Sequence, residues 1–328
     1  MSAPKISLED VLGPVAGGLE RMRLMMIEQL TDHSASVRDM TDHISRFRGK
    51  QLRGALVLLA GEATGNATDE HPQVAAIVEM IHLATLVHDD VLDGAEVRRR
   101  VACVNERWDN QVAVLLGDFL YARAFALSTE LSSRLASRVL SDTTRRLCVG
   151  EIDQSQRRYD FEMPQDVYES IAGAKTATLY AAACELGARY PGGNEETGRE
   201  MRALGWELGL SFQIIDDCLD LTGTQEAVGK SVGNDVEDGK VTLPVLHVYA
   251  SADETTRAAI RDAYTAPGIE GRAQHLREVV DLTPGVDYAL ARAQELIEQA
   301  RRRIAELPPT PARTALDALT AFVLERNW

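Results

Sequence analysis

Cysteine is scarce in this chain, and the placement of the few that occur excludes disulfide scaffolds and cysteine-ligated metal sites. The 328 residues include four cysteines, none at metal-ligand spacing from another: Cys103, Cys148, Cys184 and Cys218. Small disulfide-stabilised secreted domains carry more cysteines, and structural zinc sites use closely spaced pairs. We therefore expect reduced, mostly buried thiols in a cytoplasmic protein.

Positive charge is scarce as well. The chain has 35 Lys and Arg against 50 Asp and Glu, which leaves a formal net charge of -15. A protein that binds nucleic acid needs a basic surface to meet the phosphate backbone. We therefore expect no nucleic-acid partner.

Long apolar runs are missing too. The stretch 74–87 is interrupted by Glu79 and His82, and it falls short of the roughly 20 apolar residues that a membrane-spanning helix needs. The first ten residues lack the apolar region and the small-residue cleavage site of a signal peptide. The sequence predicts no membrane span and no secretion.

What the chain has throughout is helical periodicity. Stretches rich in Ala, Leu, Glu and Arg, all strong helix formers, occupy residues 112–128, 133–159, 167–188 and 199–220. Glycine and proline mark the joints between such stretches, and no convincing alternation typical of strands is present. We predict one all-α domain over residues 1–328.

An aspartate triplet with the spacing Asp-Asp-x-x-Asp occurs twice, each time in an apolar, helix-like run. The two copies are Asp89, Asp90, Asp93 and Asp216, Asp217, Asp220. Residues four apart lie on one face of a helix, where like charges repel unless a cation lies between them. Hard oxygen ligands without neighbouring cysteines favour Mg²⁺, held by carboxylates, waters and the phosphates of a substrate.

Basic and polar residues accompany both triplets. His82 lies two turns before Asp89, and Gln213 lies one turn before Asp217. The basic groups are Arg98 and Arg99 after the first triplet, Lys230 and Lys240 in a glycine-containing loop after the second, Lys50 and Arg53 at a helix start, and Lys175 beside Thr176 in an apolar helix. Taken alone, each is more typical of surface charge or of a lysine that extends to solvent. Their proximity to the aspartates favours a phosphate-binding role.

These motifs, in this order over residues 49–244, resemble the trans-isoprenyl diphosphate synthase (polyprenyl synthetase) family, and most of all its long-chain, octaprenyl-type members. The resemblance implies an antiparallel helical bundle around a deep central cavity, which is the isoprenoid synthase fold. It implies Mg²⁺-dependent condensation of isopentenyl diphosphate with an allylic diphosphate: geranyl, farnesyl or geranylgeranyl diphosphate. It also implies a homodimer.

The resemblance assigns roles residue by residue. Metal binding is implied for Asp89 and Asp93, with Asp90 supporting them, and for Asp216 and Asp220, with Asp217 alongside. The residues implied to hold isopentenyl diphosphate are Lys50, Arg53, His82 and Arg99. Those implied to hold the allylic diphosphate are Arg98, Lys175, Lys230 and Lys240. Gln213, Thr176 and the Lys175 carbonyl group are implied to lie beside the allylic cation.

Several positions depart from the family pattern, among them Gln51, Gly54, Arg100 and Ala102. They stand where the family usually has Arg, Pro, Gly and Pro. The loss of a glycine and a proline after the first triplet removes turn-favouring residues. We expect these departures to alter the loop after the first triplet and the affinity for isopentenyl diphosphate, and to leave the metal sites intact.

Two small residues, Ala84 and Thr85, lie about one turn before Asp89. In the family, bulky aromatic residues there give short products, and each turn of wall that is cleared adds about 5.4 Å of depth. We predict a product longer than farnesyl diphosphate, in the hexaprenyl to decaprenyl range, with geranylgeranyl diphosphate as the alternative.

Three other activities remain as alternatives. A terpene cyclase shares metal-triggered ionisation, but such enzymes favour aromatic-lined pockets, and aromatic residues make up 5% of this chain. A helical metal phosphohydrolase based on His88 and Asp89 usually needs more histidines than the seven present, and it leaves the second triplet unexplained. A non-catalytic synthase subunit is expected to lose aspartates or arginines that are all present here.

Overall fold

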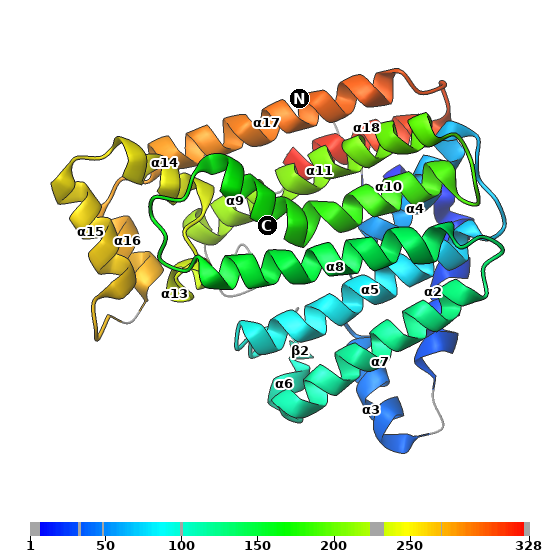
Figure 1. Cartoon of the computed structure of the whole chain (residues 1–328), viewed down its shortest axis with the longest axis horizontal. Helices are drawn as coiled ribbons and strands as arrows, with labels where there is room; N and C mark the ends of the chain where they lie inside the picture. Colours follow the sequence, from blue (N-terminus) through cyan, green and yellow to red (C-terminus); the bar gives the residue numbers. More distant parts are fainter. Residues whose placement is uncertain are drawn as a thin grey trace. The chain divides into compact units, whose positions relative to one another are not determined.

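The computed structural model describes residues 7–31, 34–47, 49–98, 101–223, 233–269 and 271–324. The prediction of an all-α fold is confirmed (Figure 1), because the strands among these residues are only β1 (Val97–Arg98) and β2 (Val101–Ala102), an antiparallel hairpin. Contacts group the chain into two compact units. Unit 1 comprises Met1–Thr144, Leu179–Gly205 and Ala300–Phe322, and unit 2 comprises Arg145–Thr178, Trp206–Gln299 and Val323–Trp328. The single domain stays a prediction.

Unit 1 contains the first aspartate triplet. Its helices are α1 (Leu8–Val11), the 3-10 turn η1 (Gly13–Val15), α2 (Ala16–Leu30), α3 (Ala35–Ile44), α4 (Leu52–Thr64), α5 (His71–Leu92), α6 (Val104–Arg107), α7 (Asn110–Thr129), nearly all of α10 (Thr178–Arg189) and most of α18 (Pro311–Leu324). Unit 2 contains the second triplet. Its elements include α9 (Gln165–Ala172), the π-helical turn η2 (Gly173–Ala177), α13 (Asn234–Glu237), α14 (Leu243–Ser251), α15 (Glu254–Thr265) and α16 (Arg272–Val279). Residues of both units occur in α8 (Leu135–Gln156), α11 (Glu195–Thr222) and α17 (Thr283–Ala305).

Helix α5 carries the first triplet and packs against α2, α4 and α7 (Figure 1). Residues 74–78 of α5 are completely buried, as expected for a run of Val, Ala and Ile. The approach of α7 is close because Gly117 has no side chain: a Cβ atom there would lie 2.1 Å from the His88 Nε2 atom. The end of α5 is therefore held firmly where the aspartates begin.

Helix α7 is the one described helix that is long and apolar enough to cross a membrane by length and composition, with a mean hydropathy of 1.4. Its buried residues, among them Leu116 and Leu120, belong to an apolar cluster that also contains Val87 of α5. Packing in the core of unit 1 thus accounts for part of this apolar character.

The stretch 167–188, predicted as one helix, contains a π-helical turn. The turn η2 separates α9 from α10, and it begins at Gly173, where a Cβ atom would lie 2.3 Å from the indole ring of Trp206. Single π turns within helices are rare and frequently occur at functional sites. Two of the predicted site residues, Lys175 and Thr176, lie in this turn.

Candidate active site

The first triplet lies at the C-terminal end of α5. Asp89 is half-buried, Asp93 is the exposed C-cap residue, and α5 has no basic residue in its last turn. Carboxylates are unfavourable at this end of a helix because the macrodipole is negative there. Asp89 and Asp93 therefore form an accessible pair that a bound cation would stabilise.

The middle aspartate of this triplet is turned into the protein. Asp90 is fully buried, and its Oδ1 atom accepts hydrogen bonds from Arg98 Nε at 2.8 Å and Nη2 at 2.6 Å. Burial by itself would lower the pKa of Arg98, but the hydrogen bond and the charge of Asp90 raise it above its usual value. Burial, followed by the charge of Asp90, also raises the pKa of the Cys103 thiol to about 12. Asp90 thus holds Arg98 in place; the roles predicted for Asp90 in metal binding and for Arg98 in diphosphate binding stay predictions.

Two of the residues predicted to hold isopentenyl diphosphate are in direct contact. The Arg53 guanidinium group lies 2.9 Å from His82 Nε2, and it stacks over the Tyr180 ring at 4.5 Å. Lys50 lies over the ring of Phe322 in α18, at 4.6 Å from its centre. Aromatic faces attract cations and hold their orientation. Arg99, Arg100 and Lys230 lie outside the described residues.

The departure at Gly54 has a structural cause. Its backbone N–H donates a hydrogen bond of 2.7 Å to Glu79 Oε1, a buried carboxylate on α5. Proline cannot make this bond because it has no N–H. A Cβ atom at Gly54 would also lie 2.4 Å from Met22 Sδ. The neighbouring departure, Gln51, accepts a hydrogen bond of 2.7 Å from Arg23, so both positions serve contacts with the interior or with α2.

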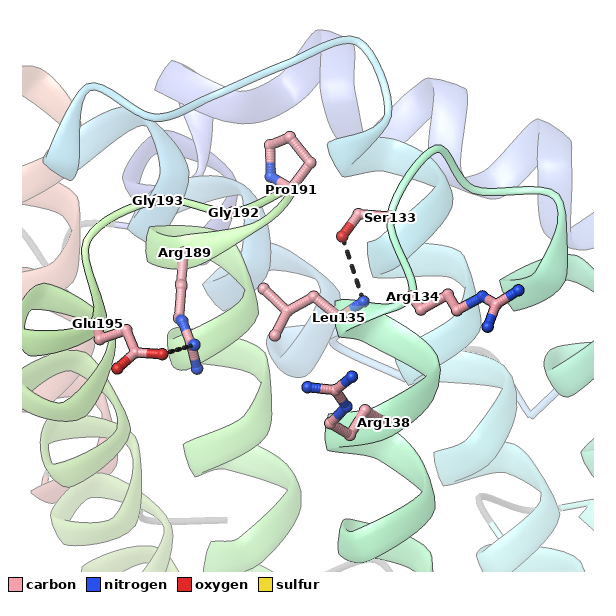
Figure 2. A pocket seen from close by; sticks show the side chains of 9 residues that line it. All are labelled: Ser133, Arg134, Leu135, Arg138, Arg189, Pro191, Gly192, Gly193 and Glu195. Atoms are coloured by element: carbon pink, nitrogen blue, oxygen red, sulfur yellow. Dashed lines mark hydrogen bonds and ion pairs between the residues drawn. The ribbon is translucent and has the colours of Figure 1, made fainter.

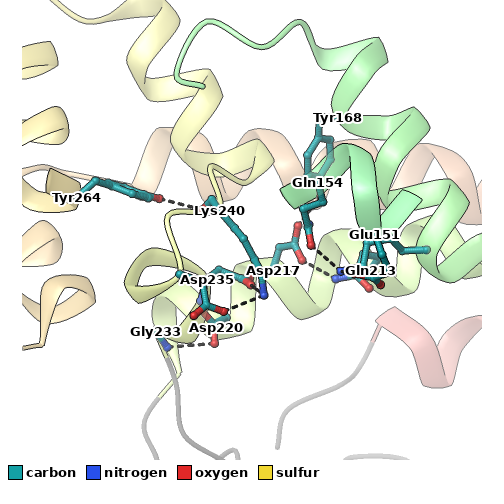
Figure 3. A network of polar contacts seen from close by, with 12 residues as sticks. Glu151, Gln154, Tyr168, Gln213, Asp217, Asp220, Gly233, Asp235, Lys240 and Tyr264 are labelled. Carbon is teal, nitrogen blue, oxygen red and sulfur yellow. Dashed lines mark hydrogen bonds and ion pairs between the residues drawn. The ribbon is translucent and has the colours of Figure 1, made fainter. Parts of the chain in front are cut away.

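The second triplet lies near the end of α11, and its middle aspartate is also buried (Figure 3). Asp217 accepts one hydrogen bond from the Tyr168 hydroxyl group and another from Gln213 Nε2, each of 2.6 Å. Burial raises the pKa of Asp217 to about 7; the two hydrogen bonds oppose this shift, and the charges of Asp216 and Asp220 reinforce it. Asp216 is half-buried and is the most accessible member of the triplet.

The third aspartate of this copy anchors the chain that follows. The Asp220 carboxylate accepts hydrogen bonds from the backbone N–H groups of Gly233, at 3.0 Å, and Asp235, at 3.1 Å. Lys240, which was predicted to bind phosphate, lies 2.9 Å from Asp238 and 3.9 Å from Asp235. Burial, together with the charges of Asp217 and Asp220, raises the pKa of Asp235 well above its usual value. Several carboxylates thus crowd one small region of unit 2.

The π turn connects to this region through Gln213. The Thr176 hydroxyl group donates a 2.6 Å hydrogen bond to Gln213 Oε1, so Thr176, Gln213, Asp217 and Tyr168 form one continuous chain of hydrogen bonds. Beside it, Lys175 Nζ lies 2.9 Å from Glu151 Oε2 and donates a hydrogen bond to Gln154. The three residues predicted to lie next to the reacting carbon are therefore brought together in unit 2.

Comparison with known proteins identifies the family. Residues 34–282 match the family described as Polyprenyl synthetase. The chain belongs to the polyprenyl synthetase family. It is 36% identical to an all-trans-nonaprenyl-diphosphate synthase (geranyl-diphosphate specific) of Rhodobacter capsulatus, over 97% of this chain and 98% of that one. It is 32% identical to the octaprenyl diphosphate synthase of Escherichia coli (strain K12), over 98% and 100%.

A solved structure supports the same conclusion. The crystal structure of a polyprenyl synthase from Caulobacter crescentus CB15, complexed with calcium and isoprenyl diphosphate, superposes with a TM-score of 0.93 at 32% identity, covering 100% of both chains. The predictions of family, helical fold and prenyltransferase activity are thus confirmed.

The residues of this synthase suit a divalent cation that is shared with a substrate. In the part of the chain that the structure describes, no group of three or more His, Cys, Asp or Glu residues forms a ready metal cage. Mg²⁺ seldom uses such cages, since it is usually held by one or two carboxylates, waters and substrate phosphates. In unit 1 the accessible pair Asp89 and Asp93 meets that description, and in unit 2 the accessible Asp216 does.

Sequence reasoning missed four residues of the site: Glu151, Gln154, Tyr168 and Asp235. A sequence signal existed for the first two, because a Glu and a Gln three residues apart share one face of a helix. The structure adds that Gly150, next to Glu151, lies against Lys175. No sequence pattern links Tyr168 to Asp217, which is 49 residues away.

The two residues predicted to control product length differ in their surroundings. Ala84 is completely buried in the apolar cluster with Leu116 and Leu120 of α7. Thr85 is half-buried, and its hydroxyl group bonds to the His82 carbonyl oxygen at 2.8 Å. Thr85 is thus the position at which a larger side chain finds space more easily.

Proposed function

We propose that this synthase condenses isopentenyl diphosphate with an allylic diphosphate to make an all-trans polyprenyl diphosphate longer than C15. The observation that carries the proposal is the similarity to nonaprenyl and octaprenyl diphosphate synthases, which are 36% and 32% identical to this chain over nearly its full length. Both aspartate triplets are intact in this chain. Small residues at positions 84 and 85 favour a long product.

The cofactor that we propose is Mg²⁺; the proposed ligands are Asp89 and Asp93 in the first triplet and Asp216 in the second. When bound, Mg²⁺ neutralises charge on the diphosphate and makes it a better leaving group. The calcium in the Caulobacter structure supports a divalent cation in this family. In this chain, Asp220 contributes by anchoring α13, and Asp90 by anchoring Arg98.

The allylic diphosphate is proposed to bind Lys175 and Lys240 in unit 2; the family resemblance also assigns Arg98 and Lys230 to this substrate. Negative charge grows on the leaving oxygen as the carbon–oxygen bond breaks, and preorganised cations stabilise it most at that moment. Glu151 and Gln154 hold the Lys175 ammonium group in place. Asp238 does the same for Lys240.

The allylic cation is proposed to form beside Thr176, Gln213 and the Lys175 carbonyl group. Thr176 donates its hydroxyl hydrogen to Gln213, which leaves the lone pairs of the Thr176 oxygen available to the cation. Gln213 is held in turn by Asp217. The network therefore presents oxygen atoms rather than hydrogens to positive charge.

Isopentenyl diphosphate is proposed to bind to Lys50, Arg53, His82 and Arg99. Contacts with aromatic rings orient Lys50 and Arg53 before the substrate arrives. Side chains that are oriented in advance are expected to lower the entropic cost of bringing the double bond to the allylic cation. The departing diphosphate is proposed to accept the final proton.

The decisive experiment is incubation with labelled isopentenyl diphosphate, Mg²⁺ and geranyl, farnesyl or geranylgeranyl diphosphate in turn, followed by sizing of the products. We expect polyprenyl chains longer than C15. A product that stops at geranylgeranyl diphosphate would support the alternative, and a hydrocarbon would indicate a terpene cyclase. An absence of elongation with every primer would overturn the proposal.

We also propose a homodimer located in the cytoplasm. Leu115 and Val114 on α7 are 59% and 42% exposed, and an apolar helix face of this kind is stabilised by a partner. Sedimentation equilibrium measures the mass directly. Leu115→Glu is expected to shift the equilibrium toward the monomer, and a wild-type monomer at micromolar concentration would refute the dimer.

A further inference from the structure

A hollow of about 300 Å³ lies in unit 1, between the start of α8 and the loop that joins α10 to α11 (Figure 2). Its walls carry three arginines, Arg134, Arg138 and Arg189, and one acidic residue, Glu195. In Figure 2 the Arg138 side chain extends toward the side on which Arg189 lies, while the Arg134 side chain points away from the other two arginines. No residue of the proposed active site lines this arginine pocket.

The positive charge of the arginine pocket is only partly compensated. Arg189 forms ion pairs with Glu185 and Glu195. Among the described residues, none forms a hydrogen bond or an ion pair with the guanidinium group of Arg134 or Arg138. Three arginines against one glutamate give the lining a charge of +2, in a chain whose net charge is -15.

The positions of Arg134 and Arg138 are also electrostatically unfavourable for two reasons. They lie four residues apart, a spacing at which like charges repel on a helix. They flank the first turn of α8, which contains no acidic residue, and cations are disfavoured at the positive end of a helix dipole. An anion in the pocket relieves both penalties.

The pocket lies at the opposite end of α5 from the first triplet. Glu70, the residue before α5, accepts hydrogen bonds from the Ser132 N–H group at 3.0 Å and from the Tyr190 hydroxyl group at 2.6 Å. Ser132 and Tyr190 adjoin the pocket residues Ser133 and Pro191. Asp89 lies 19 residues along the chain from Glu70, which is about 28 Å of helix.

We propose that the arginine pocket binds a phosphate group. Guanidinium forks bind phosphate oxygens in pairs, which makes arginine better suited to phosphate than to a simple inorganic anion such as chloride. Two sources share this chemistry: a soluble diphosphate and the headgroup of an anionic phospholipid.

The position of the pocket offers a reason for it to bind a lipid headgroup. This argument rests on the proposed function. With bonds of about 1.5 Å, the roughly thirty consecutive carbon–carbon bonds of an eight-unit product exceed the length of α5. A tail that grows along α5 from Asp89 reaches the end of the helix where the pocket lies. A phosphate site there would hold that end against a membrane surface able to accept the tail.

The test compares Arg134→Gln/Arg138→Gln with a matched control, Arg21→Gln/Arg38→Gln, which removes the same charge from two exposed arginines elsewhere in unit 1. One arm titrates inorganic diphosphate into each protein by calorimetry, with EDTA present so that metal-dependent binding is suppressed. The other arm measures cosedimentation with phosphatidylcholine vesicles with and without phosphatidylglycerol.

Binding in either arm that weakens at least fivefold in the pocket variant, and less than twofold in the control, supports the proposal and identifies the source. Equal weakening in both variants, or no binding in either arm, overturns it. The pocket variant is expected to melt within 2 °C of wild type and to elongate farnesyl diphosphate normally in detergent. Elongation and pocket binding are measured separately, so failure of the proposed function is distinguishable from failure of the pocket.

Discussion

The two aspartate triplets have the same spacing but different buried partners. In the first, the middle residue Asp90 meets a cation, Arg98, and in the second, Asp217 meets two neutral donors, Tyr168 and Gln213. The pKa of Arg98 is raised by its pairing, whereas the pKa of Asp217 rises to about 7 because burial outweighs its hydrogen bonds. In the first triplet the buried carboxylate is therefore neutralised by an arginine. In the second triplet the buried carboxyl group is stabilised only in part, by two neutral donors.

The outer aspartates differ as well. Asp89 and Asp93 both reach solvent at the end of α5. In the second copy only Asp216 is comparably accessible, because Asp220 accepts two backbone hydrogen bonds that hold α13. Equal spacing in sequence therefore does not make carboxylates equally available to a metal.

The largest effect is expected from the outward-facing aspartates. Asp89→Asn should lower kcat by about 10³-fold, since it removes charge stabilisation at the leaving group. Steady-state kinetics with Mg²⁺ measures the loss. Activity within tenfold of wild type would show that the first triplet is not a metal site, and an unchanged melting temperature would exclude misfolding as the cause.

Substitutions of the two middle aspartates should lower the free energy of unfolding by different amounts. Asp90→Asn leaves Arg98 without its charge partner, and breaking such a pair costs about 3 kcal/mol, the lower end of the range because the Arg98 side chain is 27% exposed. Asp217→Asn should cost about 1 kcal/mol, since its partners are neutral and an amide can still accept one of the two bonds. Urea unfolding of both variants measures the difference. Equal costs would remove the contrast between the triplets.

Tyr168→Phe removes one of the two neutral donors to Asp217. We expect a loss of about 1–2 kcal/mol in stability, because Asp217 loses a buried donor, and a roughly tenfold fall in kcat with KM for isopentenyl diphosphate unchanged.

The matched control for that variant is Tyr190→Phe, which removes a 2.6 Å hydrogen bond to a different carboxylate, Glu70. It should cost similar stability and leave kcat unchanged. If both variants lower kcat equally, Tyr168 has only a structural role.

The smallest effect on rate is expected at Thr85. Thr85→Phe should shorten the product while kcat changes less than about tenfold, because only the wall for the tail is altered. Thr85→Ser serves as the control and should preserve the product. Ala84→Phe, by contrast, overfills a packed cluster and should cost about 1–3 kcal/mol. Chromatographic sizing of the products decides, and an unchanged product from Thr85→Phe would reject this position as a determinant of length.

The helices themselves were largely predictable. The stretches expected at 112–128, 133–159 and 199–220 correspond to Asn110–Thr129, Leu135–Gln156 and Glu195–Thr222, because helix-forming residues between breakers define them locally. The π turn at Gly173–Ala177 was not predictable, since it accompanies the contact between Gly173 and Trp206. The antiparallel strands Val97–Arg98 and Val101–Ala102 were missed because two-residue strands have no detectable periodicity.

By itself, the sequence determined the helical class, the family and the positions of the two triplets, because spacing along a chain decides which residues share a face of a helix. Tertiary structure decided what each aspartate contacts. Tyr168 and Asp217 are 49 residues apart, and Gly54 and Glu79 are 25 apart, so these contacts exist only after the helices pack. The cost of burying a carboxylate must be offset by hydrogen bonds from the donors that packing brings to it. The Asp-Asp-x-x-Asp motif does not specify which donors these are.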